Sequence, residues 1–132
     1  MAEPQVHEIL LQKAAADETA SRGLSELPGI TDDIIGFHVQ QAIEKRLKAV
    51  LASRGIEYPF THDLRRLCAL IEEAGITLPA PAMDLNAYTP FAAITRYEYP
   101  LDLPVLERPA ALALLERTRS WAAAQVQDRS RP

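Results

Sequence analysis

The sequence predicts an all-α protein, an up-and-down bundle of four to five helices, on three observations. Alanine and leucine are abundant while aromatic residues make up only 6% of the chain, and this composition favours helices over sheet. Apolar residues recur at helical spacing in several segments. No segment alternates apolar and polar residues over the length of a strand, and no internal repeat is present.

Length and composition indicate one domain. The 132 residues are enough to bury a core, and 48% apolar with 24% charged residues is the balance of a globular protein. No apolar run reaches the roughly 20 residues that a membrane helix needs. The N-terminus is acidic and polar where a secretory signal would be basic and then apolar. We therefore expect a cytoplasmic protein with no membrane segment, a single domain over 1–132 whose ends, 1–4 and 128–132, are frayed.

The N-terminal segment is expected to form a first helix that starts near Pro4 and ends at Gly23. Proline fits the first turn of a helix, and glycine commonly follows a helix end. Asp17 and Glu18 are expected on the exposed side of this helix, and residues 25–30 form a connecting loop. The expected buried stripe is Leu10, Leu11, Ala14 and Ala15.

The second helix has the clearest signals. Thr31 is a suitable N-cap, and Asp32 and Asp33 follow in the first turn, where the helix dipole favours negative charge. Gly55 marks the end of the helix. Its apolar stripe is Ile35, Val39, Ile43, Leu47 and Val50. A helix of this length, roughly 35 Å at about 1.5 Å per residue, is expected to form the spine of the bundle.

Thr61 is expected to cap a third helix that reaches Gly75, with Asp63 in its first turn. The apolar stripe of this helix is Leu64, Leu67, Cys68 and Ile71. Cys68 is the single cysteine and cannot form an internal disulfide. Its apolar neighbours favour a core residue over a nucleophile.

Two further segments are expected to be helical. The fourth helix covers residues 82–97, but Pro90 interrupts its hydrogen bonds, which predicts a kink or two short helices. Residues 98–104 contain two prolines and are not expected to be helical throughout. The last helix begins between Leu106 and Pro109 and continues to about residue 127. Its expected buried residues are Leu114, Leu115, Trp121 and Val126.

The charge distribution is uneven. The net charge of −4 argues against bulk nucleic-acid binding, and residues 1–37 carry seven acidic and two basic side chains. Residues 38–66 carry three acidic and six basic side chains, a local charge of +3. This basic stretch is either an ordinary solvated surface or a binding face.

Several kinds of reaction centre have no signature in the sequence. The five glycines are not spaced for a phosphate-binding loop, and there is no Cys-x-x-Cys or pair of histidines that would indicate zinc. Glu72 and Glu73 are adjacent and so point apart on a helix, which removes an obvious carboxylate pair. We expect neither a metal nor a cofactor.

A row of polar donors is predicted along one face of the second helix. Its members are His38, Gln41, Lys45 and Lys48. Their spacing of three, four and three positions places them together, beside the apolar stripe. Such a row suits phosphate or an acidic partner, and it is equally compatible with a solvated helix face. The uncharged pair Gln40-Gln41 favours binding, because solubility does not require amides in the middle of a helix.

Three residues elsewhere are also candidates. His62 is expected in the first turn of the third helix, where the positive end of the dipole favours a neutral imidazole. It either ties the turn to the helix or takes part in function. Arg96 and Tyr97 are expected to close the fourth helix, and become functional only if other polar residues join them.

Residues 37–64 contain a distinctive order of short segments. They are Phe37-His38, Gln40-Gln41-Ala42, Glu44-Lys45, Leu47-Lys48, Arg54-Gly55-Ile56 and Thr61-His62-Asp63-Leu64. This order resembles the HEPN domain of prokaryotes. The first and fourth helices add matching segments: Gln12-Lys13-Ala14 with Asp17, and Thr89-Pro90-Phe91 with Arg96-Tyr97.

The resemblance implies an all-α bundle that is often a homodimer and is frequently encoded beside a minimal nucleotidyltransferase in a toxin–antitoxin-like pair. Many members of the family are metal-independent ribonucleases that use an arginine followed a few residues later by a histidine. In this chain no histidine follows Arg96, and Arg54 is too far upstream of His62. The ribonuclease motif is therefore missing in the form that the family uses.

Two hypotheses follow. The first is a non-catalytic helical module that binds a nucleotide, RNA or a nucleotidyltransferase partner through the row of donors on the second helix, with His62, Arg96 and Tyr97 nearby. The second is a metal-independent endoribonuclease toxin with a rearranged site. In that case His62 acts as general acid or base, and Arg96 or Lys45 stabilises the transition state. A third, purely structural interpretation, a dimeric scaffold with no ligand, stays open.

Overall fold

The chain is described by a computed structural model that covers residues 3–93 and 104–129. Within these residues it has five α-helices, one short 3-10 helix and no strand, which confirms the all-α prediction. The elements in order are α1 (Val6–Ser25), α2 (Asp32–Ser53), α3 (Leu64–Glu73), α4 (Ala82–Asn86), the 3-10 helix η1 (Thr89–Ala92) and α5 (Arg108–Arg129). In this part of the chain, no helix is both long and apolar enough to cross a membrane.

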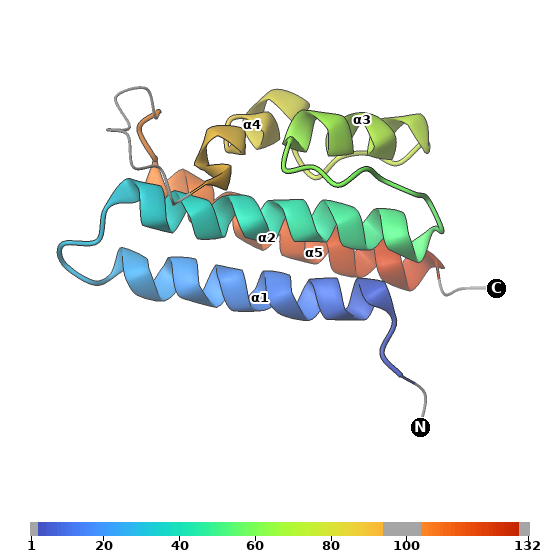
Figure 1. The fold of residues 1–132 in the computed structure, drawn as a ribbon, viewed down its shortest axis with the longest axis horizontal. Helices are drawn as coiled ribbons and strands as arrows, with labels where there is room; N and C mark the ends of the chain where they lie inside the picture. The colour runs from blue at the N-terminus through green and yellow to red at the C-terminus, as the bar shows by residue number, and fades with distance from the viewer. Residues whose placement is uncertain (1–2, 94–103, 130–132) are drawn as a thin grey trace.

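Helix α2 lies at the centre of the bundle. The three long helices α1, α2 and α5 run side by side along the molecule, and α3 and α4 lie across α2 from α1 (Figure 1). Helix α2 contacts α1, α3, η1 and α5. The predicted stripe is fully buried, which confirms its place as the spine: Ile35, Val39, Ile43, Leu47 and Val50.

The ends of α2 agree with the prediction, with one difference. Thr31 is the N-cap residue by its extended backbone, but its side chain makes no capping hydrogen bond. At the other end Gly55 has a φ of 69°, a left-handed conformation that glycine adopts without strain. The N–H groups of Gly55 and Ile56 donate to the carbonyls of Ala52 and Leu51, which is the Schellman arrangement for ending a helix.

Helix α1 is longer than predicted. It continues through Gly23 to Ser25, and the chain turns instead at Gly29, whose φ is 82°. A single glycine costs a helix only about 1 kcal/mol. The packing of α1 along α2 outweighs this cost, so Gly23 was wrongly expected to end the helix.

Helix α3 begins later than predicted. Asp63, and not Thr61, is its N-cap residue, because the Asp63 carboxylate accepts a hydrogen bond of 3.0 Å from the N–H of Arg65. The Thr61 hydroxyl accepts from the N–H of Asp63 and so shapes the turn before the helix. His62 therefore lies ahead of α3 and not in its first turn. The predicted core position of Cys68 is confirmed, and burial raises the pKa of its thiol to about 11.

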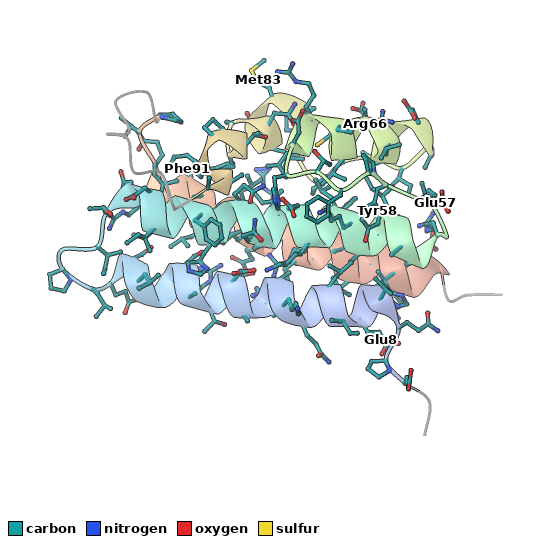
Figure 2. All side chains as sticks on the ribbon, in the orientation of Figure 1. Glu8, Glu57, Tyr58, Arg66, Met83 and Phe91 are labelled. Atoms are coloured by element: carbon teal, nitrogen blue, oxygen red, sulfur yellow. The ribbon has the colours of Figure 1, made fainter. Side chains whose placement is uncertain are left out.

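The break predicted at Pro90 is present as two short helices, α4 and η1, up to residue 93. The predicted end of the fourth helix and the loop after it fall in residues 94–103, outside the described residues. The Thr89 hydroxyl accepts a hydrogen bond from the N–H of Leu64, which ties η1 to the start of α3. Phe91 packs its ring onto α2 at Gly36, and Figure 2 shows this side chain pointing from η1 towards α2.

The last helix is anchored to both ends of α2. Near the start of α2, the Arg108 guanidinium donates to the Asp32 carboxylate and to the carbonyl of Ile30, at 3.0 and 2.9 Å. Near its end, Arg54 donates to the side chain and the carbonyl of Gln125. Of the residues predicted to be buried on α5, Leu114 and Leu115 are buried. Trp121 and Val126 are partly exposed and pack against the core.

Gly36→Ala is expected to destabilise the fold, because an added Cβ would lie 2.3 Å from Cδ1 of Phe91. The buried ring would have to move, at a cost of about 1–3 kcal/mol in the free energy of unfolding. Gly23→Ala is the matched control, since no atom lies within 4 Å of the added Cβ. It should stabilise the protein by up to about 1 kcal/mol. Urea unfolding followed by circular dichroism measures both changes, and equal shifts in the two variants would contradict the close packing of Phe91.

Candidate functional site

Polar side chains of α2 meet three carboxylates that are buried or nearly so, and each carboxylate has a different set of partners. Asp17 and Glu18 come from α1, and Glu44 comes from α2 itself. Their side chains are 12%, 4% and 4% exposed. The expectation that Asp17 and Glu18 lie on the exposed side of the first helix is therefore wrong, and the reason is that both are paired with basic residues across the helix interface.

Glu44 and His62 form a carboxylate–imidazole pair. Nδ1 of His62 lies 2.8 Å from Oε1 of Glu44. A carboxylate only accepts hydrogen bonds, so this contact places a proton on Nδ1 and leaves Nε2 as the free edge of the ring. The His62 side chain is half exposed, at 51%. The buried carboxylate thus fixes the orientation of an imidazole whose other nitrogen can reach a ligand.

Gln40 supports this pair from the buried side. Its amide nitrogen donates to Oε1 of Glu44 at 3.0 Å and to the carbonyl oxygen of His62 at 3.1 Å. The side-chain amide nitrogen of Gln41 donates to the side-chain oxygen Oε1 of Gln40 at 2.7 Å. Gln40 therefore holds the loop that carries His62, and Gln41 supports the Gln40 side chain; these roles explain both amides without a ligand.

Lys48 and two aromatic rings complete the surface around His62. The Lys48 amino group donates to Oε2 of Glu44 at 3.0 Å and lies about 6 Å from the ring centres of Tyr58 and Phe60. The Phe60 ring meets the His62 ring edge to face, with 5.8 Å between centroids. Phe60 is 95% exposed. We call Lys48, Phe60 and His62 the loop surface; Tyr58, which lies between α2 and α3 in Figure 2, is partly buried beside it.

The predicted row of donors does not act as one face. His38 and Lys45 both bind Asp17 of α1, at 2.9 and 2.5 Å. Lys48 instead binds Glu44, beside His62. The row therefore divides between the α1 side and the loop side of α2. His38 and Lys45 meet at Asp17, whereas Lys48 and His62 meet at Glu44. The remaining candidates, Arg96 and Tyr97, lie outside the described residues.

Glu18 is the centre of a second cluster, which joins the three long helices. Arg22 donates to its carboxylate through Nε and Nη2, at 2.9 and 2.7 Å. Arg46 of α2 donates at 2.7 Å and Arg119 of α5 at 3.0 Å. Arg46 is fully buried and also donates to the carbonyl of Leu115. We call Glu18 with its three arginines the Glu18 cluster.

The electrostatics of this cluster favour a charged Glu18. Burial raises the pKa of its carboxyl group, but the three guanidinium groups lower it by more, so the pKa lies below its ordinary value of 4.5. Burial lowers the pKa of Arg46, and Glu18 opposes that effect. Both groups are ionised at neutral pH, and the cluster contains three positive charges and one negative charge.

No group of three or more metal-binding side chains in residues 3–93 and 104–129 is placed to hold a metal ion. The residues that sequence reasoning missed are the carboxylates and Phe60. Glu44 had a usable signal, because it lies four positions after Gln40 and four before Lys48 on the same helix. Phe60 gave no signal of its exposure, since an apolar residue after a proline is as often buried.

The comparison with known families identifies the chain. A family model for the HEPN domain matches residues 7–121. The chain belongs to the HEPN domain family. The match includes most of α5 and all of α1 except its first residue, so it confirms the resemblance drawn from residues 37–64. No match is found among curated proteins or among solved structures. The function of this HEPN domain is therefore inferred from the geometry of its side chains.

Glu18→Gln is expected to lower the free energy of unfolding of this HEPN domain by about 3–5 kcal/mol at pH 7, because it leaves the buried Arg46 without a counter-charge. The folded-state pKa of Glu18 lies below the ordinary 4.5 of the unfolded chain. Its stabilisation is therefore complete above about pH 4.5 and is lost as the pH falls through the folded-state pKa. The difference in free energy of unfolding between wild type and Glu18→Gln should become smaller below pH 4.5. Urea unfolding over a pH series measures it.

Glu116→Gln is the control for this prediction. It removes the same charge at a distance of 4.0 Å from Arg119, but Glu116 is 66% exposed. An exposed pair contributes about 0–1 kcal/mol. A loss in Glu116→Gln as large as that in Glu18→Gln, or a Glu18→Gln effect that does not change with pH, would contradict the importance of the buried cluster.

Proposed function

We propose that this HEPN domain protein binds single-stranded RNA at the loop surface and does not cleave it. The observation that carries the proposal is the Phe60 ring, which is 95% exposed and lies against the half-exposed His62. Proteins recognise single-stranded RNA by stacking its splayed bases on aromatic rings, histidine included. The hydrogen bond to Glu44 holds the His62 ring in one orientation, which reduces the entropy lost on binding.

Positive charge near the loop surface supports RNA as the ligand. Lys48 lies about 6 Å from the Phe60 ring, but Glu44 offsets its charge. Arg65 and Arg66 are exposed in the first turn of α3, directly after the turn that carries His62. These two arginines supply the excess charge for phosphate contacts. The basic stretch of residues 38–66 thus includes an exposed aromatic ring, the combination that single-strand binding surfaces use.

We propose the partners that the family resemblance implies: a homodimer, and a minimal nucleotidyltransferase in a toxin–antitoxin-like pair. An exposed Phe60 ring is compatible with a protein partner as well as with RNA. Light scattering of the pure protein reports its oligomeric state. Co-expression with a neighbouring nucleotidyltransferase gene reports the partner, and separate elution of the two proteins would reject it.

Phe60→Ala is expected to weaken RNA binding by about 5- to 100-fold, because stacking contributes about 1–3 kcal/mol per base. Fluorescence anisotropy of a labelled single-stranded RNA measures the dissociation constant. Met83→Ala is the control: Met83 is an apolar side chain on α4 that is 80% exposed. We expect it to bind as the wild type does. Equal affinity in Phe60→Ala and wild type, or no binding by the wild type, would refute the proposal.

A second candidate function is metal-independent RNA cleavage, and the Glu44–His62 pair is the observation that favours it. A buried carboxylate that orients an imidazole, with Nε2 directed away from it, is the arrangement of a general base. Such a base can remove the proton from the ribose 2′-hydroxyl. Lys45 binds Asp17, so Lys48 is the amino group near His62 that can face the phosphate.

If the protein cleaves RNA, His62→Ala should reduce the rate by at least about 100-fold, the usual contribution of a general base. His38→Ala is the matched control, because His38 has the same kind of contact through Nδ1, to Asp17. Gel analysis of a labelled RNA incubated in a chelator measures cleavage. Intact RNA with the wild-type protein, or equal rates in the two variants, would reject this second function.

A further inference from the structure

A small cavity lies between α1 and α5, on the side of α2 away from α3. Its volume is about 120 Å³, and it is lined by Ala15, Glu18, Thr19, Arg22 and Arg119. At about 10–15 Å³ of such volume per water molecule, it has room for several waters. That is enough for one tetrahedral oxyanion. The contact between α1 and α5 and the position of α3 across α2 separate this cavity from the loop surface (Figure 1).

The lining of the cavity has an excess of positive charge. The Glu18 cluster contains three guanidinium groups and one carboxylate, which leaves two positive charges. Arg46 is buried behind the cavity, while the side chains of Arg22 and Arg119 are 41% and 52% exposed. The nearest other acidic groups offset little of this charge. Asp17 binds His38 and Lys45, and Glu116 is mostly exposed at 4.0 Å from Arg119.

The donors that line the cavity are held in place. Arg22 uses Nε and Nη2 in its described contacts, with Glu18 and with the carbonyl of Leu112. Arg119 uses Nη1 to reach Glu18. A guanidinium has five N–H donors in a rigid plane, so these contacts fix the plane and leave further N–H groups for an anion. The Thr19 hydroxyl adds a donor that carries no charge.

We propose that this cavity binds a phosphate group carrying two negative charges, as inorganic phosphate or as a terminal phosphomonoester. The lining itself carries one excess positive charge, from Arg22 and Arg119 against Glu18, and the buried Arg46 behind it adds a second. Together they match a group of charge about −1.5 to −2 at pH 7. A phosphodiester inside a nucleic-acid strand carries one charge and is flanked by two nucleosides. It therefore matches the charge of the cavity less well. This inference does not rest on RNA binding at the loop surface.

The test is isothermal titration of the full chain with inorganic phosphate, at an ionic strength held constant with sodium chloride. Arg119→Gln should weaken phosphate binding by at least about tenfold, because it removes hydrogen bonds from a charged donor. Arg117→Gln is the matched control, with the same charge change two positions away on α5 and outside the cavity lining. It should bind phosphate as the wild type does.

Two further titrations distinguish inorganic phosphate from a terminal phosphomonoester as the ligand. Adenosine monophosphate should bind with the same dependence on Arg119, and a 5′-hydroxyl RNA oligonucleotide should not compete. If only inorganic phosphate binds, the phosphomonoester half of the proposal is rejected. If Arg119→Gln fails to fold, Thr19→Val serves in its place, with an expected loss of about threefold for one neutral hydrogen bond. Phe60→Ala should leave phosphate binding unchanged, so failure of this inference is distinguishable from failure of the RNA proposal.

Two results would overturn the proposal. One is phosphate binding of equal strength in Arg117→Gln and Arg119→Gln. The other is no heat from phosphate beyond that of chloride in the wild-type protein.

Discussion

The hydrogen bonds of Glu18 constrain the arrangement of the three long helices. One carboxylate on α1 accepts from Arg46 of α2 and from Arg119 of α5, as well as from Arg22 of its own helix. Removing the Arg46 guanidinium from water costs several kcal/mol, and the cost is met only if Glu18 and the Leu115 carbonyl lie within hydrogen-bond distance. An apolar contact tolerates some sliding of one helix along another, whereas this cluster does not. We infer that Glu18 fixes the register of α1 against α2 and α5.

Glu44, on α2, is also a buried carboxylate with polar partners, but it lies on the other side of the helix and binds a different set of groups. Its partners are one lysine, one amide and one imidazole, so Lys48 already balances its charge. The loop surface therefore has little excess charge of its own and presents flat rings. The Glu18 cluster has no flat ring and a surplus of two positive charges. The net charge on each side of α2 therefore depends on the number of cations that bind its carboxylate: three arginines for Glu18 and one lysine for Glu44.

Periodicity and turn chemistry predicted the apolar frame of this HEPN domain. Ile35 and the rest of its stripe are buried, Gly55 ends α2, and a separate short helix begins at Thr89–Pro90. These features depend on residues close in sequence, where spacing is informative. Gly23 was misjudged because its effect of about 1 kcal/mol is smaller than the packing energy of α1 against its neighbours.

The candidate site was less predictable because its contacts join residues far apart in the chain. Asp17 and Glu18 have the composition of a solvated helix face, and only their partners on α2 and α5 make them interior residues. The same partners divide the predicted row, drawing His38 and Lys45 to α1 while Lys48 turns to Glu44. The order of residues 37–64 was enough to indicate the family. It did not show which of these side chains contact one another.

The family's ribonuclease motif places an arginine and a histidine close together in sequence, whereas the arginines of the Glu18 cluster are bound on the side of α2 that faces away from His62. These arginines are bound by Glu18 between α1 and α5, while His62 is bound by Glu44 beside α3. A guanidinium held by a buried carboxylate cannot move to a distant imidazole without leaving that carboxylate unpaired, at a cost of several kcal/mol. The arginines of the Glu18 cluster are thus unable to complete a cleavage site at His62. This separation supports the proposal that the loop surface binds RNA without cleaving it.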